Sequence, residues 1–269
     1  MASSRATLRV GVASTFTCEP IARWLTFWLG ELGVQPSLQF AGYDQLHQEL
    51  RSPAAFADAA VCLALVSFSD WDRTASAGFD ADRFESNLQL LCDGIAAALP
   101  VLSGRLALIV CPSPPAVDEA EAAARAAAYQ AASATLKAIA SREPRLGVLS
   151  AADVASWYPV AEAFDAAADA LGHVPYTEPM WCALGGAAAR LARQLPRVAP
   201  PLKALVVDCD YTLWHHAVGE VGANGVVVAP RHAALQRRLL ALHARGVLLC
   251  LCSRNTPDDV WTALRPAGN

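Results

Sequence analysis

The sequence predicts an α/β protein built on a parallel sheet with helices on both faces. Short apolar runs alternate with helical stretches along most of the chain, as in folds made of β-α-β units. The runs at Ala59–Val66 and Arg105–Val110 are apolar almost throughout. Such runs are typical of strands buried on both faces of a parallel sheet.

The individual elements follow from periodicity and from the residues that end each stretch. Gly33 is a helix-ending residue after the first helical stretch. Acidic residues open the alanine-rich stretch after Asp118, where they suit the helix dipole. The expected strands are Leu8–Ala13, Ser37–Ala41, Ala59–Val66, Arg105–Val110 and Leu146–Leu149. The expected helices are Glu19–Leu32, Asp44–Leu50, Asp82–Leu99, Asp118–Ala140, Val160–Leu171 and Met180–Arg193.

A proline-rich segment, residues 196–202, predicts a linker between a first domain at 1–195 and a second at 203–269. The second domain reads as one β-α-β unit, for which a right-handed crossover is expected. A unit this small cannot enclose a hydrophobic core alone, so we expect it to pack against the first domain, another chain, or residues outside this sequence. Its elements are expected at Ala204–Val207, Arg231–Arg245, Val247–Cys252 and Pro257–Leu264.

The amino-acid composition indicates the cellular compartment and excludes some classes of binding partner. Hydrophobic residues make up 54% of the chain and charged residues 17%, which allows an extensive core. The net charge of -4 gives no general attraction to nucleic acid or to an anionic membrane. The eight cysteines lack zinc-type spacing, and most lie in or beside apolar runs. With no signal-peptide pattern and no run long enough to span a bilayer, a reduced cytoplasmic protein is expected.

Two carboxylates follow the strand that opens the second domain. Asp208 and Asp210 are one residue apart at its carboxyl end, where open α/β sheets bind their ligands. One carboxylate can attack phosphorus and the other can move a proton. Mg²⁺ would neutralise the phosphate charge. The alternative is an ordinary solvated acidic turn.

The next strand supports the phosphate hypothesis. It ends in Leu251-Cys252-Ser253-Arg254-Asn255, and a serine hydroxyl at a strand tip can donate a hydrogen bond to a phosphoryl oxygen. One helix separates this strand from the acidic pair. Carboxyl ends of neighbouring parallel strands meet at one sheet edge, so Ser253 is expected close to Asp208.

These motifs resemble those of the FkbH-like family, in subclass IIIC of the haloacid dehalogenase (HAD) superfamily. The family shows a DCDNTLWGGVVGEDG-like stretch and an ICSKN-like strand end, and this chain has DCDYTLWHHAVGEVG and LCSRN. The resemblance covers Lys203–Glu220 and Pro230–Asn255. It implies an Mg²⁺-dependent phosphatase/glyceryltransferase. Such an enzyme removes phosphate from 1,3-bisphosphoglycerate and loads the glyceryl unit onto an acyl carrier protein in polyketide-type biosynthesis.

The resemblance also assigns roles to single residues. Asp208 matches the nucleophile and Asp210 the general acid/base, and both match metal ligands. Thr212, which supports the loop, matches a phosphate-binding position, as do Ser253 and Asn255. These roles are implied by the family.

Cys209 has two interpretations. It is a candidate carrier of the glyceryl unit as a thioester. It is equally a buried structural thiol, because on a strand its side chain points away from those of Asp208 and Asp210.

The chain departs from the family pattern at several places. Tyr211 stands where the family has Asn, and His215-His216 replace a Gly pair. Adjacent histidines on a turn rarely bind one metal together. The family's third and fourth motifs, a lysine and an acidic pair, are not found among the 16 residues after Ser253. The resemblance is therefore to a C-terminally truncated member, and whether the chain is an enzyme by itself stays open.

The first domain resembles the N-terminal domain of FkbH-like proteins, which is similar to the SGNH-hydrolase fold. The resemblance rests on Thr15-Phe16-Thr17, on Tyr43–Pro53 and on Gly172–Thr177. It implies an SGNH- or flavodoxin-like parallel sheet.

Two functions of this domain remain open. Ser14 after the first strand and the late His173 could form the cleft of an esterase or acyltransferase. However, there is no Gly-Asp-Ser block, and Asp169 precedes His173 by four residues instead of three. The alternative is a non-catalytic domain that docks the carrier protein or shapes the substrate pocket. Asp70 and Trp71 are expected either to line the same cleft or to cap a loop.

Overall fold

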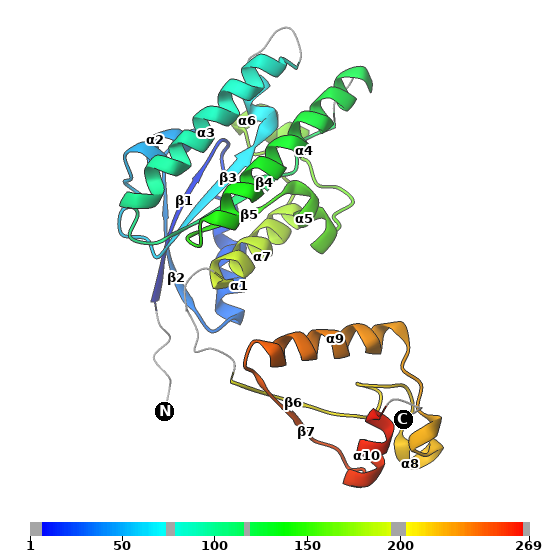
Figure 1. The fold of residues 1–269 in the computed structure, drawn as a ribbon. Coiled ribbons are helices and arrows are strands. Elements are labelled where there is room, and N and C mark those ends of the chain that lie inside the picture. Colours follow the sequence, from blue (N-terminus) through cyan, green and yellow to red (C-terminus); the bar gives the residue numbers. More distant parts are fainter. Residues whose placement is uncertain (1–6, 74–78, 116–118, 195–202, 266–269) are drawn as a thin grey trace. The chain divides into compact units, whose positions relative to one another are not determined.

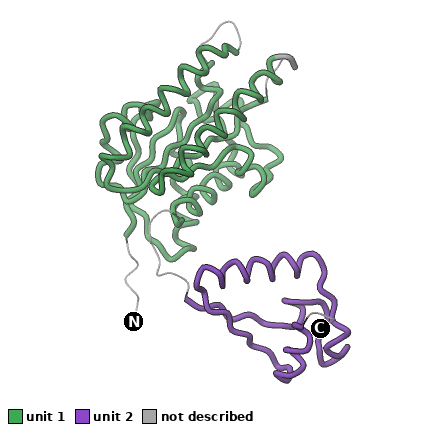
Figure 2. The backbone as a smooth tube through the Cα atoms, viewed as in Figure 1, with its two compact units in different colours: residues 1–199 green, residues 200–269 purple. Residues whose placement is uncertain are grey.

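The computed structural model describes residues 7–73, 79–115, 119–194 and 203–265. The chain divides into two compact units, residues 1–199 and 200–269 (Figure 2). The expected linker at 196–202 lies outside the described residues.

Unit 1 contains a five-stranded sheet in the order β2-β1-β3-β4-β5, and every neighbouring pair is parallel (Figure 1). The central strand β3 is buried along its whole length, as its continuous apolar run predicts. The predicted α/β fold class with a central parallel sheet is confirmed. The strands are β1 Thr7–Ser14, β2 Gln35–Phe40, β3 Val61–Ser67, β4 Arg105–Cys111 and β5 Leu146–Leu149.

Helices cover both faces of this sheet (Figure 1). Successive strand residues point to opposite faces. In β3, Leu63 and Leu65 therefore join one apolar cluster while Cys62 and Ala64 join the other. The first cluster includes residues of α1 Ile21–Glu31, α5 Ala151–Trp157 and α7 Glu178–Gln194. The second includes residues of α2 Leu46–Arg51, α3 Ala81–Val101 and α4 Glu119–Arg142.

One predicted helix of unit 1 is wrong. The stretch Val160–Leu171 is helical only in α6, Ala166–Gly172, and α5 precedes it. Helix α5 begins because the Ser150 side chain accepts a hydrogen bond from the amide of Asp153, whose carboxylate accepts one from the amide of Ser150 at 2.8 Å. Between the helices, Phe164 pairs with Tyr176 in an isolated antiparallel bridge, which interrupts the helical periodicity.

The strand order places a topological switch point between β1 and β3. The chain runs from β1 to β2 on one side and on to β3 on the other, so the connections diverge there. Ligands of open α/β sheets bind at this crevice, outside the carboxyl ends of the strands. Thr15 follows β1, and the short 3₁₀ helix η1, Phe68–Asp72, follows β3.

Unit 2 has two parallel strands, β6 Ala204–Val207 and β7 Leu248–Leu251. Trp214 is fully buried in its small core, which also contains Leu213, Val218, Leu239 and others. The remaining elements of the unit are α8 Val218–Val221, η2 Ala223–Gly225, α9 Pro230–Ala244 and α10 Pro257–Leu264.

Within the parts of the chain that the structure describes, no helix is both long enough and apolar enough to cross a membrane.

Candidate functional site

Strand register brings the predicted phosphate-site residues of unit 2 to one sheet edge. Val207 of β6 pairs with Leu251 of β7, and the amide of Cys252 donates to the carbonyl of Val207 at 2.9 Å. Asp208 directly follows β6, and Ser253 follows β7 by two residues. The carboxyl ends of both strands therefore present the predicted side chains together.

Asp210 is held by three N–H donors. One of its oxygens accepts from Trp214 Nε1 at 3.1 Å and from the amide of Val218 at 3.1 Å, and the other accepts from Asn255 Nδ2 at 2.8 Å. Burial raises the pKa of Asp210, but the hydrogen bonds from Asn255, Val218 and Trp214 outweigh it and hold the pKa below its ordinary value. In this conformation Asp210 is an ionised hydrogen-bond acceptor.

Asp208, unlike Asp210, is not held by hydrogen bonds. Its side chain is exposed, and its carboxylate forms no hydrogen bond or ion pair with any described residue. A nucleophile must have an unoccupied oxygen that the substrate can reach. Of the two predicted carboxylates, Asp208 is the one that meets this requirement.

Asn255 connects the two strand ends. Besides its contact with Asp210, its Nδ2 donates to Ser253 Oγ at 3.0 Å, and its amide donates to the same oxygen at 3.2 Å. Asn255 therefore positions Asp210 and Ser253, although the family resemblance predicts direct contact with phosphate. The hydroxyl hydrogen of Ser253 takes no part in these two bonds.

The loop after β6 turns tightly around one carbonyl. The amides of Thr212 and Leu213 both donate to the carbonyl of Cys209, at 3.3 and 2.8 Å. Thr212 thus lies in the loop that it was predicted to support. Tyr211 and His216 have positive φ angles of 58° and 74°. These are positions at which the FkbH-like pattern has Asn and Gly, the residues that tolerate this backbone region best.

Tyr211→Asn is expected to stabilise unit 2 by about 0.5–1 kcal/mol, because Asn adopts the left-handed region at lower cost than Tyr. The ring is largely exposed, so little packing is lost. Hydrogen exchange of the unit 2 amides measures the effect. Tyr211→Ala is the control, since it removes the ring but keeps the cost of a positive φ. Equal stabilisation by both variants would contradict the backbone explanation.

Cys209 is completely buried, with no exposed surface. Burial raises the pKa of its thiol, and the charges of Asp208 and Asp210 raise it further against a lowering contact from Ser253. A buried thiol with a raised pKa is a poor nucleophile. The structure therefore favours the structural-thiol interpretation of Cys209 over the glyceryl-carrier interpretation.

Three of the four histidines of unit 2, His215, His216 and His232, lie near one another beside this loop. The ring centroids of His215 and His216 are 4.2 Å apart, and that of His232 lies 6.3 Å from His215. No group of three or more His, Cys, Asp or Glu side chains among the described residues is arranged to hold a metal ion.

The fit to Mg²⁺ depends on Asp208. The oxygens of Asp210 already accept from three N–H groups, so the predicted pair of carboxylate ligands reduces to one free carboxylate. Mg²⁺ commonly binds through one or two carboxylates and completes its shell with water and substrate phosphate. The donors present therefore fit an ion shared with a phosphorylated substrate.

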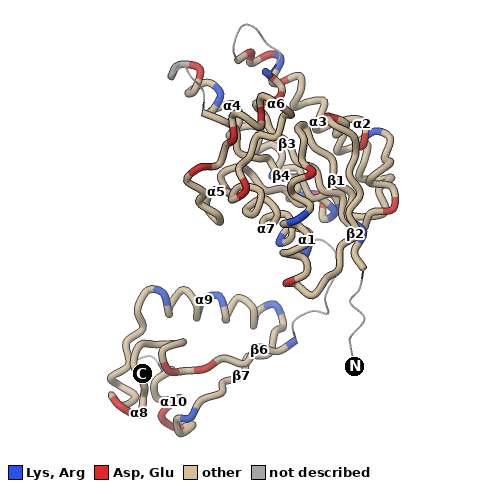
Figure 3. Tube along the Cα trace, turned by 180° about the vertical axis from the view of Figure 1, so that it is seen from behind, with Lys and Arg blue, Asp and Glu red and all other residues tan. Residues whose placement is uncertain are grey.

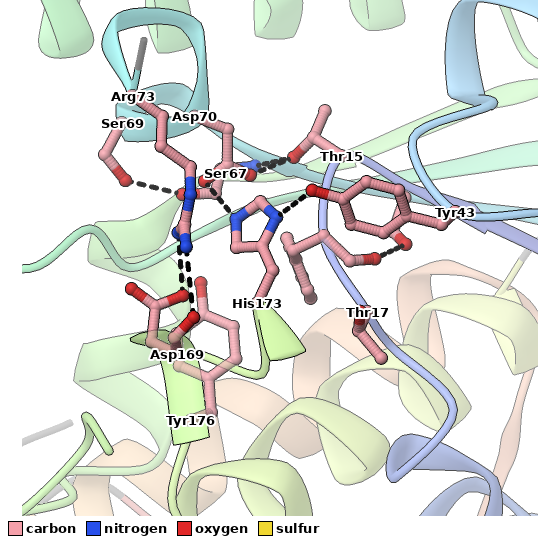
Figure 4. A network of polar contacts seen from close by, with 12 residues as sticks. Thr15, Thr17, Tyr43, Ser67, Ser69, Asp70, Arg73, Asp169, His173 and Tyr176 are labelled. Atoms are coloured by element: carbon pink, nitrogen blue, oxygen red, sulfur yellow. Dashed lines mark hydrogen bonds and ion pairs between the residues drawn. The ribbon is translucent and has the colours of Figure 1, made fainter. Parts of the chain in front are cut away.

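A second polar site lies at the switch point of unit 1 (Figure 4). Thr15 Oγ1 donates to Asp70 Oδ2 at 2.5 Å and accepts from the amide of Ser67 at 3.0 Å. The other oxygen of Asp70 lies 3.0 Å from His173 Nε2, and His173 Nδ1 lies 2.7 Å from the hydroxyl of Tyr43. Four segments distant in sequence thus join in one chain of hydrogen bonds.

The expected Ser14–His173 pair is not formed. Ser14 is buried and donates to the carbonyl of Phe16 at 2.5 Å, on its own segment. The aliphatic hydroxyl next to Asp70 belongs to Thr15, and the Asp70 carboxylate lies between it and the imidazole; the hydroxyl that contacts the imidazole itself is the phenol of Tyr43. In a hydrolytic triad the imidazole lies between hydroxyl and carboxylate, so that it can take the hydroxyl proton. This arrangement does not support a Ser–His hydrolase.

Asp169 also has a different partner from that of a hydrolase triad. Arg73 donates to its carboxylate at 2.8 Å and to its carbonyl at 3.0 Å. Asp70 orients His173 instead, which agrees with its expected place in the cleft. Thr15 and Tyr43 were not predicted as members of this site. Thr15 could have been found as the first hydroxyl beyond β1, whereas nothing local marks Tyr43.

Asp70→Asn is expected to lower the free energy of unfolding of unit 1 by about 2 kcal/mol, because it removes a charge that accepts two hydrogen bonds. Urea unfolding followed by tryptophan fluorescence measures the change. The control is Asp58→Asn. The Asp58 side chain is 85% exposed and its carboxylate lies 3.9 Å from the Arg9 guanidinium, so the free energy of unfolding should change by about 0.5 kcal/mol or less. Equal effects of the two variants would contradict a structural role for the network.

The fold is similar to known structures. One is the N-terminal part of protein BF1531 from Bacteroides fragilis, described as containing a phosphatase domain complexed with Mg. It matches with a TM-score of 0.78 and 14% identity over 97% of this chain and 72% of that chain. A catalytic mutant of Axe2, an acetylxylan esterase from Geobacillus stearothermophilus, matches with a TM-score of 0.45 and 12% identity. That match covers 71% of this chain and 95% of the esterase.

At these identities the likeness concerns the fold alone. No protein-family model matches the sequence. No curated protein matches it either. The α/β architecture, with its central parallel sheet flanked by helices, is what this chain shares with the BF1531 structure.

Proposed function

We propose that this protein is an FkbH-like cytoplasmic phosphatase/glyceryltransferase. It would act on the acyl phosphate of 1,3-bisphosphoglycerate and load the glyceryl unit onto an acyl carrier protein in polyketide-type biosynthesis. One observation carries the proposal. An exposed carboxylate without a partner, Asp208, lies at the carboxyl edge of the sheet beside the firmly held Asp210.

Attack at phosphorus accounts for phosphate removal. An oxygen of Asp208 bonds to phosphorus, the bond between phosphorus and the acyl oxygen breaks, and 3-phosphoglycerate leaves as its carboxylate with the electron pair. A carboxylate leaving group has a pKa of about 4 and needs no proton. This suits Asp210, whose oxygens face three N–H donors and which therefore holds no proton to give. Water then hydrolyses the aspartyl phosphate.

Attack at the acyl carbon accounts for glyceryl transfer. The sulfur of the carrier's thiol bonds to the carbonyl carbon, the bond from that carbon to the phosphate oxygen breaks, and inorganic phosphate leaves with the thiol proton, which gives a 3-phosphoglyceryl thioester. Asp208 would then attack the phosphorus of the remaining phosphate. The bond from phosphorus to the glyceryl oxygen breaks, and that oxygen takes a proton from water, which gives the glyceryl thioester. Asp208 and Ser253 would hold the phosphate end in both reactions. Mg²⁺, bound by Asp208 and substrate oxygens, would supply charge neutralisation.

The contacts described above give less support to the two alternative functions, an esterase and a carrier-docking protein. An SGNH-type esterase would need an imidazole next to a serine hydroxyl, whereas in unit 1 the His173 imidazole contacts Asp70 and the phenol of Tyr43, and Ser14 is bonded to its own segment. A non-catalytic carrier-docking role for unit 1 is compatible with the proposal. As the function of the whole chain, docking alone leaves the free Asp208 carboxylate without a role.

The test is intact-protein mass spectrometry of this chain and an acyl carrier protein after incubation with 1,3-bisphosphoglycerate and Mg²⁺. A glyceryl mass gain on the carrier is expected, and it should disappear with Asp208→Asn. Carrier binding without glyceryl transfer or phosphate release would favour the docking function and contradict the proposal.

A further inference from the structure

Arg254 lies at the same sheet edge as the two carboxylates. It is the third residue after Leu251, and Leu251 pairs with Val207, which directly precedes Asp208. In Figure 3 acidic positions follow β6, and a basic position lies between β7 and α10. A cation and two anions therefore follow neighbouring strands at their carboxyl ends.

The backbone around Arg254 is fixed while its side chain is free. Its neighbours Ser253 and Asn255 are bonded to each other, and Asn255 is bonded to Asp210. Arg254 itself is exposed and forms no hydrogen bond or ion pair with a described residue. The first turn of α10 contains two acids, and one of them, Asp259, accepts a hydrogen bond from Thr256 Oγ1 at 2.7 Å.

A phosphoryl group needs positive charge at this edge. Two carboxylates repel its oxygens, and transferring it spreads negative charge over the non-bridging oxygens. Among the described residues of unit 2 the one lysine is Lys203, which precedes β6 at the opposite end of the strand. Arg231 is engaged with the ring of His232 at 3.2 Å. Arg254, three residues after the end of β7, is the arginine that follows a strand at its carboxyl end.

We propose that the Arg254 guanidinium binds the non-bridging oxygens of the phosphoryl group that Asp208 receives. Its fork of N–H donors matches two phosphate oxygens. Arg254 would then supply positive charge to the phosphoryl group from the tip of β7. The inference rests on the proposed function for the identity of the reaction, but not for the binding of phosphate.

The first measurement is a ³¹P NMR titration with inorganic phosphate and Mg²⁺. Arg254→Gln should weaken phosphate binding at least about tenfold, and Arg254→Lys should retain part of it. Arg237→Gln is the matched control, because Arg237 is an exposed arginine of α9 without a partner among the described residues. This control should bind phosphate like the unsubstituted protein. Binding by Arg254→Gln within about twofold of the control would overturn the inference.

The second measurement is the rate at which acetyl phosphate phosphorylates the protein. Arg254→Gln should lower this rate by about 10²–10³-fold, the typical loss of one charge-stabilising donor. The two measurements separate the two claims. If no phosphoenzyme forms but phosphate binding still depends on Arg254, the proposed function fails and the inference stands. An unchanged phosphorylation rate in Arg254→Gln would overturn the inference while leaving the proposed function intact.

Discussion

Asp208→Asn is expected to abolish phosphate release from an acyl phosphate, with a loss of about three orders of magnitude or more. The amide has nearly the shape of the carboxylate but cannot form the aspartyl phosphate. Because Asp208 is exposed and forms no hydrogen bond or ion pair with another described residue, the substitution removes the nucleophile with little loss of packing. Phosphate release from acetyl phosphate with Mg²⁺ is the measurement.

The matched control for this variant is Asp258→Asn. Asp258 is also an exposed acid of unit 2, at the start of α10, and it lies outside the predicted nucleophile motif. Its replacement should leave the rate within about twofold of the original, as expected for a surface substitution. A similar loss in both variants would show that the effect comes from net charge, and would contradict the nucleophile assignment.

Trp214→Ala is expected to destabilise unit 2 by about 3–5 kcal/mol, the usual cost of deleting a buried aromatic ring. Trp214 has no exposed surface and lies in a core of few residues. Its ring nitrogen also donates to Asp210, so the variant removes one of the three contacts that hold that carboxylate. Amide hydrogen exchange in β6 and β7 should accelerate strongly.

Two variants separate packing from the hydrogen bond. Trp261→Ala removes a tryptophan of the same unit that is 57% exposed, and should change exchange little. Trp214→Phe keeps most of the buried ring and loses only the donor to Asp210. It should cost less stability than Trp214→Ala. Unchanged exchange in Trp214→Ala would show that unit 2 does not depend on this core.

The fold was largely predictable because its signals are local. The apolar run of β3 and the strand at Leu146–Leu149 coincide closely with the structure, since continuous burial leaves an unbroken hydrophobic pattern. The region after Trp157 was not predictable in the same way. There the bridge between Phe164 and Tyr176 depends on contact between two segments, and helical periodicity alone does not reveal it.

The two candidate sites also differ in how far apart their residues lie in the sequence. Asp208 and Asp210 lie in one short motif that carries its own strand, so sequence was enough to find them. In unit 1 the partner of His173 is Asp70, 103 residues away, and Tyr43 is 130 residues away. Only the fold brings these side chains together, and the local signal instead pointed to Ser14.

The same reasoning applies to the Asp210 contacts. The bond from Asn255 spans 45 residues and depends on the parallel pairing of β6 with β7. The sequence placed both residues at strand ends but did not show that one holds the other. That contact changes the expected behaviour of Asp210 from proton donor to fixed hydrogen-bond acceptor.

The most direct test of the account is to map the phosphorylated residue. The protein would be incubated with acetyl phosphate and Mg²⁺, quenched in acid, and digested for peptide mass spectrometry. The account predicts a single phosphoryl group on Asp208, lost on treatment with hydroxylamine and missing from Asp208→Asn. A phosphoryl group on any other residue, or none on Asp208 under conditions in which acetyl phosphate is consumed, would contradict it.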